Sequence, residues 1–319
     1  RPGWGWSIVS FPRRFERYWN DSFAFRWYLI RAHSLAKLSL GVSPSPKALV
    51  GEDGYLFYAA ERSVDYFRGT DPFTAADLAR WRDDLESRRQ WLAERGIRYL
   101  VVVAPNKETI YGEYMPHALR KVRTDSRLDQ LLAYLAANSS IDIVDVRGAL
   151  TAAKPHQRVY HKTDTHWNDA GAMIAAREIL ARMKAWFPDL DAGPFAGELR
   201  VHAAPGGDLA RILALEDRFP EQRYDWLPAA GHEARTTGAE TAAREQVVME
   251  CAGCTGPKVV MNNDSFGENL APLLAQRFRR TALVEGSRLD RPLIERERPA
   301  IVIQEFVERA LMCPDLRGC

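Results

Sequence analysis

The pattern of apolar and polar positions divides most of the chain into alternating helices and strands. Between Thr74 and Gly96 apolar residues recur at helical spacing, with Thr74 as an N-terminal cap and Gly96 as a stop. The next segment, IRYLVVVAP at 97–105, is a continuous apolar run. Such a run is typical of a strand in a parallel sheet that is buried on both faces.

The same order recurs towards the C-terminus. Apolar periodicity predicts further helices at 125–138, at 168–185 behind Asn168, and at about 267–278. Apolar runs predict further strands at 141–146, 258–262, 281–285 and 300–307. Strands that alternate with helices form a mostly parallel sheet covered by helices on both faces. We therefore expect a three-layer α/β/α sandwich.

Two segments depart from this order. Residues 1–45 read as a helical extension rich in aromatic residues, and a hairpin-like segment follows at 48–58. Residues 190–250 are polar and rich in Gly, Ala and Glu, which predicts an insertion or long loop across one end of the sheet. The expected organisation is an N-terminal helical extension at 1–45 and one α/β domain at 46–319, interrupted at about 190–250.

Composition is typical of a soluble globular protein and argues against a nucleic-acid-binding one. Of the 319 residues 46% are hydrophobic and 27% charged, and 44 Lys and Arg against 42 Asp and Glu give a net charge of +2. Basic residues near the N-terminus form either a solvated helix face or a surface that meets a membrane or partner. These are Arg13, Arg14, Arg17, Arg26 and Arg31. The chain starts at Arg1 without an apolar signal core, which we interpret as a missing targeting segment.

The four cysteines predict structural disulfides, as expected in an oxidising compartment. Cys251 and Cys254 form the motif CAGC, and Cys313 and Cys319 lie at the C-terminus. A zinc site would prefer two CxxC-like pairs, and a redox CxxC would open a helix after a strand, so neither pattern fits well. Four cysteines allow three connectivities, among which the sequence does not choose.

The tetrapeptide NDSF occurs twice, around Ser22 and around Ser265, and only the second copy has the setting of a nucleophile. Ser265 follows a buried strand and precedes Gly267 and a helix. This turn exposes the hydroxyl and leaves backbone N–H groups to stabilise an oxyanion. Ligands of open α/β sheets bind at this carboxyl edge. Ser22 has aromatic neighbours that indicate the middle of an amphipathic helix.

A serine nucleophile needs a base and an orienting carboxylate, and YHKTDTHWNDAGA at 160–172 supplies both. Asp164 and His166 are two residues apart, so in an extended segment they project to the same side. Asp164 then orients one imidazole nitrogen, and the other faces Ser265. The alternative is a surface turn in which Asp164 and Thr165 compete to cap the next helix.

The same segment raises one metal alternative. His156, His161, Asp164 and His166 have side chains that bind zinc in other sites. They share one short segment without helical spacing, and no distant further ligand is evident. We therefore expect no metal.

Other residues near the carboxyl edge are candidates for binding substrate. Asn262 and Asn263 either donate to an oxyanion or supply turn geometry. Asn106 and Lys107 either hold a substrate hydroxyl or cap the following turn. Trp167 either stacks on a sugar or packs beside the helix start.

Six stretches together resemble the alginate O-acetyltransferase family, the AlgX/AlgJ-like branch of the SGNH hydrolase superfamily. They are GEDGYLF (51–57), VVVAPNKETIYGEYMP (101–116), YHKTDTHWNDAGA (160–172), GGDLA (206–210), VVMNNDSFGENLAPLLAQRF (259–278) and PAIVIQEFVERAL (299–311). Because the chain ends soon after its last predicted strand, we expect no carbohydrate-binding module of the AlgX type. It is then more similar to the shorter AlgJ or to cellulose-acetylation proteins.

The resemblance implies an SGNH-like fold with Ser265 as nucleophile, His166 as general base and Asp164 as its orienter, and no cofactor. It implies a periplasmic enzyme that acetylates an exported polysaccharide such as alginate or cellulose. The acetyl donor would be delivered by a membrane-bound acyltransferase in a membrane-associated complex, and the N-terminal residues would follow a removed signal or anchor. A carbohydrate acetylesterase with the same triad and a non-catalytic polysaccharide-binding scaffold are the alternatives.

Overall fold

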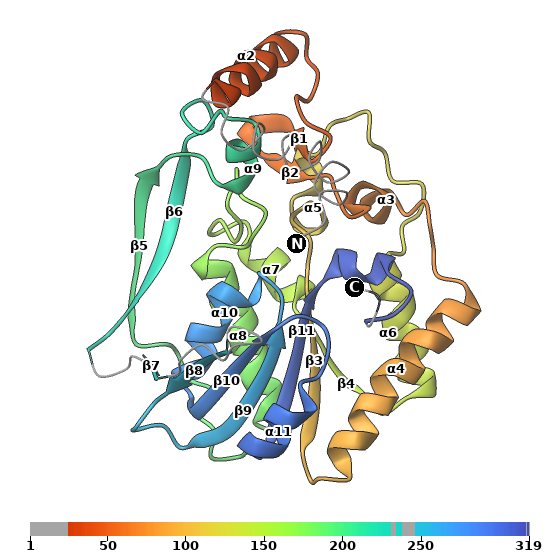
Figure 1. The fold of residues 1–319 in the computed structure, drawn as a ribbon, viewed down its shortest axis with the longest axis vertical. Helices are drawn as coiled ribbons and strands as arrows, with labels where there is room; N and C mark the ends of the chain where they lie inside the picture. Colours follow the sequence, from red (N-terminus) through yellow and green to blue (C-terminus); the bar gives the residue numbers. More distant parts are fainter. Residues whose placement is uncertain (1–24, 231–233, 238–245, 317, 319) are drawn as a thin grey trace, which may run out of the picture.

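The computed structural model describes residues 25–230, 234–237, 246–316 and 318. Within these residues the centre is a seven-stranded sheet, which confirms the predicted α/β fold (Figure 1). Its strand order is β4 (Asp142–Asp145), β3 (Arg98–Ala104), β11 (Ile301–Val307), β9 (Gly256–Asn263), β10 (Phe278–Glu285), β8 (Gln246–Glu250) and β7 (Arg235–Thr236). The strands from β4 to β10 are parallel, and β8 and β7 continue the sheet antiparallel.

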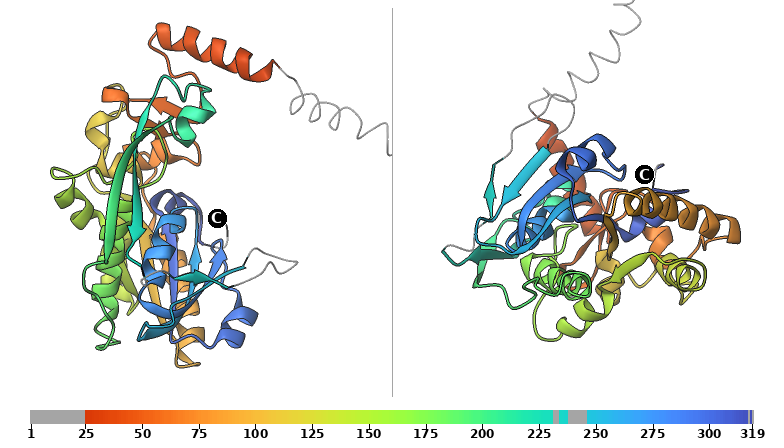
Figure 2. Two further views of the ribbon diagram at one scale, coloured as in Figure 1. Left: turned by 90° about the vertical axis from the view of Figure 1, so that its left-hand side faces the viewer. Right: turned by 90° about the horizontal axis from the view of Figure 1, so that it is seen from below.

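Helices cover both faces of this sheet, so the three-layer arrangement is also confirmed (Figure 2). One face packs on α7 (Arg147–Ala153), α8 (Asp169–Met183) and α10 (Gly267–Ala275). The other packs on α4 (Ala75–Ala93), α6 (Arg127–Asn138) and α11 (Arg291–Glu297). Side chains of β3 alternate between the two cores, with Leu100 in the first and Val101 in the second. Both are fully buried, which is why residues 100–104 of this strand are all apolar.

The helix boundaries follow the capping signals of the sequence. The Thr74 hydroxyl accepts a hydrogen bond from the Asp77 N–H, and the Asp77 carboxylate accepts one from the Thr74 N–H. The side chain of Asn168 accepts a hydrogen bond from the Gly171 N–H and begins α8. Gly96, with φ +70°, lies where the chain turns from α4 into β3.

Residues 190–250 contain more regular structure than the predicted loop. β5 (Gly197–Ala204) and β6 (Glu221–Pro228) form an antiparallel ribbon, and α9 (Asp208–Ile212) lies between them in sequence. β7 and β8 belong to the same segment and join the central sheet. Most side chains of β5 are exposed, so this strand has no apolar run by which it could be recognised.

Short elements gather above the carboxyl edge of the sheet (Figure 1). The predicted hairpin is present as β1 (Ala48–Val50) and β2 (Leu56–Tyr58). It is accompanied by α3 (Ser63–Arg68) and α5 (Lys107–Ile110) and by 3-10 turns at Glu52–Gly54, Gly112–Tyr114 and Glu308–Met312.

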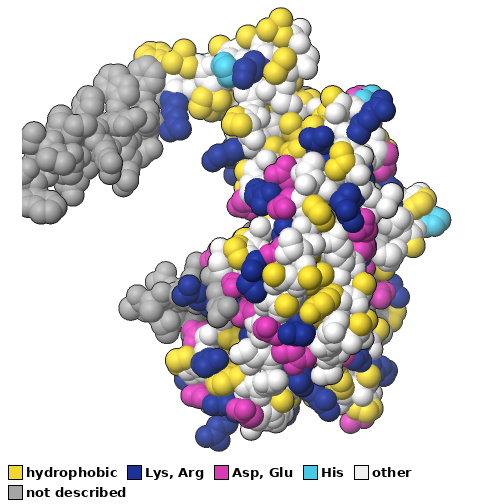
Figure 3. Space-filling model, turned by 90° about the vertical axis from the view of Figure 1, so that its right-hand side faces the viewer, with side chains coloured by type: hydrophobic (Ala, Val, Ile, Leu, Met, Phe, Trp, Pro, Cys, Tyr) yellow, Lys and Arg dark blue, Asp and Glu magenta, His cyan; other side chains and the backbone are white. Residues whose placement is uncertain are grey.

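The N-terminal helix α2 (Arg26–Ser39) projects from the body of the protein (Figure 2). Residues 1–24 of the predicted helical extension, which include Ser22, lie outside the described residues. The side chains of Phe25, Tyr28 and Leu29 are exposed, and Arg31 pairs with Asp217. No helix in the described ranges has the length and hydropathy needed to cross a bilayer. Figure 3 shows one face of the protein, on which basic and acidic side chains are interspersed.

A disulfide joins Cys251 and Cys254 in the turn between β8 and β9. The prediction of a structural disulfide is therefore confirmed for the CAGC motif. Cys319 lies outside the described residues.

Candidate active site

Ser265 lies in the turn between β9 and α10, at the carboxyl edge of the parallel strands. Residues of the adjacent strand β11 form hydrogen bonds with this turn. The Asp264 carboxylate accepts hydrogen bonds from the N–H groups of Phe266 (2.8 Å) and Val307 (2.8 Å). The Asp264 N–H donates to the Glu305 carboxyl at 3.1 Å. The residue before Ser265 is thereby fixed to a neighbouring strand, and Ser265 is held with it.

Gly267 makes the turn possible by close packing. A Cβ on this residue would lie 2.4 to 2.6 Å from the side chain of Asn263, closer than real contacts allow. The Gly267 N–H already donates to the Asp264 carbonyl at 3.0 Å. Among the described residues the Ser265 N–H has no hydrogen-bond acceptor, which leaves it as the backbone donor available to an oxyanion.

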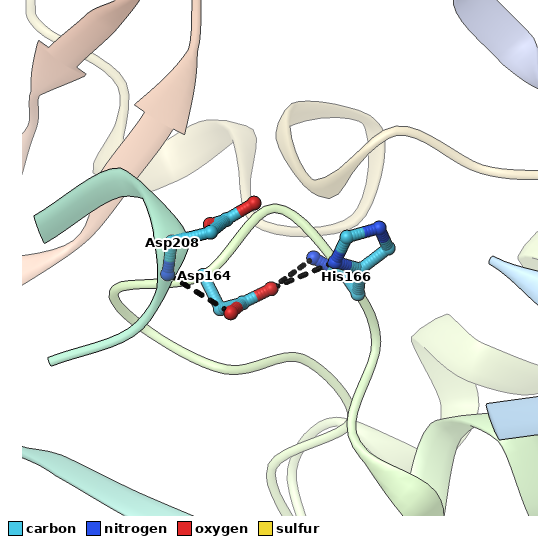
Figure 4. A group of neighbouring side chains, drawn as sticks. All are labelled: Asp164, His166 and Asp208. Carbon is cyan, nitrogen blue, oxygen red and sulfur yellow. Dashed lines mark hydrogen bonds and ion pairs between the residues drawn. The ribbon is translucent and has the colours of Figure 1, made fainter. Parts of the chain in front are cut away.

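Ser265, His166 and Asp164 form a continuous hydrogen-bonded series. The Ser265 Oγ lies 2.8 Å from His166 Nε2, and His166 Nδ1 lies 2.8 Å from Asp164 Oδ1. The same Asp164 oxygen accepts the His166 N–H at 3.1 Å, and Asp164 Oδ2 accepts the Asp208 N–H at 3.0 Å (Figure 4). These are the distances that a serine nucleophile, a general base and its orienting carboxylate require.

The pKa values of this pair favour a histidine that holds protons strongly beside an ionised aspartate. Burial raises the pKa of Asp164. The hydrogen bond and charge of His166 and the surrounding N–H donors lower it by more, so the net pKa lies well below its usual value. Burial lowers the pKa of His166, whereas the hydrogen bond and charge of Asp164 raise it more, so it lies above the ordinary 6.5. Asp164 thus stabilises the protonated form of the His166 ring.

Lys107 holds the loop that carries Asp164. Its ammonium donates to the carbonyls of His161 (3.2 Å), Lys162 (3.0 Å) and Asp164 (2.6 Å). Burial lowers the pKa of this ammonium to about 8, against the charges of Asp164 and nearby carboxylates. All three donors are used, so Lys107 supports the loop and is not placed to hold a substrate hydroxyl.

The GGDLA stretch at 206–210 closes over the same loop. A Cβ on Gly207 would lie 2.5 Å from the Asp164 Cβ and 2.7 Å from its Oδ2, so only glycine permits this approach. The Asp208 carboxylate accepts the Thr165 N–H at 2.7 Å. The sequence assigned no role to these two residues, although GGDLA was among the resembling stretches.

Trp167 connects the histidine loop to the serine turn. Its indole Nε1–H donates to the Phe266 carbonyl at 3.0 Å, and the two rings meet edge to face at 5.4 Å between centroids. The side chain is fully buried, so it offers no ring face to a sugar. Of the two predicted roles, packing is the one observed.

The remaining amide candidates are placed differently from one another. Asn262 Nδ2 donates to the carbonyl of Arg288 at 2.8 Å, and the side chain is fully buried, so it supports the loop after β10 and is not an oxyanion donor. Asn263 lines a cavity with Ser265, and its Nδ2 donates to the Asp264 carbonyl. Asn106 is buried, and neither side-chain polar atom has a partner among the described residues.

The structure does not assemble the four residues weighed as a metal cluster. Asp164, His166 and Asp208 are instead the group whose ligand atoms lie within 4.8 Å of one another in the described residues (Figure 4). Both Asp164 oxygens and one Asp208 oxygen already accept N–H donors, as described above. His156 is exposed, and His161 is buried with an unpaired Nδ1. The group is arranged for hydrogen bonding more than for coordination.

Two cavities open beside Ser265, and both are lined by Asp264 and Ser265. The smaller, of about 240 Å³, lies between α10, β8 and β10. The larger, of about 550 Å³, lies towards β11 and is lined by charged groups that include Glu61, Arg62 and Arg309. Ser265 is therefore reached from two sides, of which the larger carries charged groups of both signs and the smaller only acidic ones.

Comparisons with known proteins agree with this fold. The family described as "SGNH hydrolase-like domain, acetyltransferase AlgX" matches residues 48–280. The probable alginate O-acetylase AlgJ of Pseudomonas aeruginosa is 26% identical over 296 residues, which cover 85% of this chain and 68% of that protein.

Two solved structures share the fold. The O-acetyltransferase domain of Pseudomonas putida AlgJ superposes with a TM-score of 0.57 at 20% identity, over 84% of this chain and 92% of that one. A DHHW family protein from Eubacterium siraeum superposes with a TM-score of 0.60 at 16% identity, also over 84% of this chain and 92% of that one.

Proposed function

This chain belongs to the SGNH hydrolase-like acetyltransferase family of AlgX, and we propose that it transfers acetyl groups to an exported polysaccharide through an acetyl-serine intermediate. The observation that carries the proposal is the unbroken series from Ser265 Oγ through His166 to Asp164, with 2.8 Å at each step. The name of the related alginate O-acetylase supports an exopolysaccharide such as alginate as acceptor, and cellulose is the other polysaccharide expected from the sequence.

The first half-reaction forms the acyl-enzyme. Ser265 Oγ attacks the acetyl carbonyl of the donor while His166 Nε2 takes the hydroxyl proton, and the Ser265 N–H stabilises the oxyanion. The bond from the carbonyl carbon to the leaving oxygen then breaks, and His166 returns the proton to the leaving group. Asp164 keeps the His166 imidazole oriented throughout and stabilises its charge.

The second half-reaction transfers the acetyl group. A sugar hydroxyl enters, His166 takes its proton, and the hydroxyl oxygen attacks the acetyl-serine carbonyl. The ester bond to Ser265 breaks, and Ser265 Oγ recovers the proton from His166. The larger, charge-lined cavity suits a polar carbohydrate chain, so we assign the acceptor to that side.

The cellular setting of the proposal follows the relatives. We propose a periplasmic protein in a membrane-associated complex, with the acetyl donor delivered by a membrane-bound acyltransferase. We propose residues 46–319 as the catalytic domain and assign α2, which precedes it, to a connection with the membrane or a partner. The disulfide Cys251–Cys254 supports an oxidising compartment.

An acyl-enzyme experiment tests the proposal. The protein is incubated with p-nitrophenyl acetate, and its intact mass is measured. We expect one acetyl adduct that is lost in Ser265→Ala and kept in Ser287→Ala, because Ser287 lines the larger cavity without a histidine partner. Ser22→Ala, in the other NDSF copy, should also label. Labelling of Ser265→Ala would contradict the assignment.

Oligosaccharide acceptors test the second half-reaction. We expect an acetylated sugar, found by mass spectrometry of the products. Release of acetate with no acetylated sugar, for both alginate and cellulose oligosaccharides, would contradict transfer and favour the esterase.

A further inference from the structure

The smaller cavity beside Ser265 has apolar walls. They come from three elements that lie side by side in Figure 1: β8, β10 and α10. The apolar lining residues are Val247, Met249, Ala271, Pro272 and Leu283. This surface forms a pocket into which an acyl group on Ser265 can extend.

The pocket is larger than an acetyl group requires. Its volume is about 240 Å³, whereas about 10–15 Å³ on this scale holds one water molecule, and an apolar cavity of about 150 Å³ binds benzene. The part of an acetyl group beyond the carbonyl is one methyl. An acyl chain several carbons longer therefore has room and an apolar surface to contact.

The charged side chains at this pocket have one sign. Glu268 and Glu285 line it together with Asp264, and none of its described lining residues is basic. Both glutamates are exposed at the rim of the pocket, and like charges repel, so these side chains disfavour a carboxylate on the acyl group. The pocket thus suits neutral acyl chains and disfavours dicarboxylic half-esters.

We propose that this cavity is an acyl pocket through which the protein accepts neutral aliphatic acyl groups longer than acetyl. The inference rests on the proposed function, because it uses the same acyl-serine. Its chemistry is the same transfer: the carbonyl carbon of the longer acyl group bonds to Ser265 Oγ, and its bond to the leaving oxygen breaks. The proton passes from Ser265 through His166 to that leaving oxygen. No electrons are exchanged.

A chain-length series tests the pocket. The acylation rate of the full chain is measured with p-nitrophenyl acetate, butyrate, hexanoate and succinate, each corrected for its spontaneous hydrolysis. A buried methylene contributes about 0.8 kcal/mol, which is about fourfold in rate if the transition state realises all of it. We expect butyrate and hexanoate to acylate Ser265 at least as fast as acetate, and succinate at least tenfold more slowly than butyrate.

A filled pocket supplies the matched control. Ala271→Leu adds volume inside the cavity, and Ala310→Leu adds the same atoms in the larger cavity. The hexanoate-to-acetate rate ratio should fall at least tenfold in Ala271→Leu and stay unchanged in Ala310→Leu. Leu283→Phe fills the pocket from β10 and takes the place of Ala271→Leu if that variant does not fold.

The outcomes separate the two proposals. If acetate labels Ser265 but hexanoate reacts more than tenfold slower in the wild type, the acyl pocket is wrong and the proposed function stands. An unchanged ratio in folded Ala271→Leu and Leu283→Phe also overturns the pocket. If no ester labels Ser265, the proposed function fails and the pocket fails with it.

Discussion

Replacing Gly207 by alanine should disable the site through one steric contact. Gly207 lies at φ −73° and ψ −158°, which alanine adopts without strain, so the substitution tests the contact alone. The new Cβ would meet the Asp164 Cβ at 2.5 Å, its Oδ2 at 2.7 Å and its Cα at 2.9 Å. Asp164 is held on its other side by His166, so it cannot yield without moving the imidazole.

The required displacement sets the magnitude. Ordinary contacts begin at about 3.4 Å, and the closest one here is 2.5 Å, so about 0.9 Å of movement is needed (3.4 − 2.5). A misplacement of about 1 Å at catalytic groups costs about 100-fold in rate. We expect the acylation rate of Ser265 to fall by about that factor, and overpacking to lower the free energy of unfolding by about 1–3 kcal/mol.

The assay is single-turnover acylation by p-nitrophenyl acetate, with thermal unfolding measured on the same samples. Gly148→Ala is the matched control, because Gly148 lies in α7 and a Cβ there meets nothing within 4 Å. That variant should keep the wild-type rate and gain about 0.5–1 kcal/mol of stability. A folded Gly207→Ala with the wild-type rate would refute the argument that Gly207 positions Asp164.

Three further predictions concern the groups around the triad. Asp164 raises the pKa of His166, and only neutral imidazole accepts a proton, so the acylation rate should increase with pH around a midpoint above 6.5. Asp164→Asn should move this midpoint of the pH–rate profile to lower pH. A wild-type midpoint below 6.5 would contradict the raised pKa. The Lys107 pKa of about 8 means that its ammonium loses one of its three donors as the pH rises past 8, so the acylation rate should decline there. Lys107→Met should lower the acylation rate about 10- to 100-fold and abolish this alkaline decline. A decline that persists in the variant would assign it to another group. Trp167→Phe removes the hydrogen-bond donor to the Phe266 carbonyl. The free energy of unfolding, measured by denaturant titration, should therefore fall by about 1–3 kcal/mol, and acylation should slow. Unchanged stability would show that this hydrogen bond is dispensable.

The strands and helices of the sandwich could be predicted because their signals are local. β3 is a run of apolar residues buried on both faces, and α4 carries its cap in Thr74 and Asp77. The ribbon of β5 and β6 was missed because most of the β5 side chains face solvent. Exposed strands have no need of the apolar pattern on which the prediction depends.

The candidate catalytic residues could also be predicted, because each has a recognisable pattern of neighbouring residues in the sequence. Ser265 sits between a strand and a helix, and Asp164 precedes His166 by two residues. The two-residue spacing explains why Nδ1 of His166 finds Asp164, whereas the separation of 99 positions between His166 and Ser265 carries no information about their distance in space. Tertiary packing decides that distance, because the Trp167 indole N–H donates to the Phe266 carbonyl and so joins the histidine loop to the serine turn.

The sequence by itself determined the order of the main sandwich elements and the chemical types at the site, and it predicted that Ser265 and not Ser22 is the nucleophile. The tertiary structure alone decided the supporting roles. The buried Lys107 ammonium binds carbonyls of the histidine loop, and Asn262 binds the loop after β10. Gly207 leaves the space that the Asp164 side chain occupies. Such roles depend on which backbone atoms approach one another in space, and neither periodicity nor residue type records that approach.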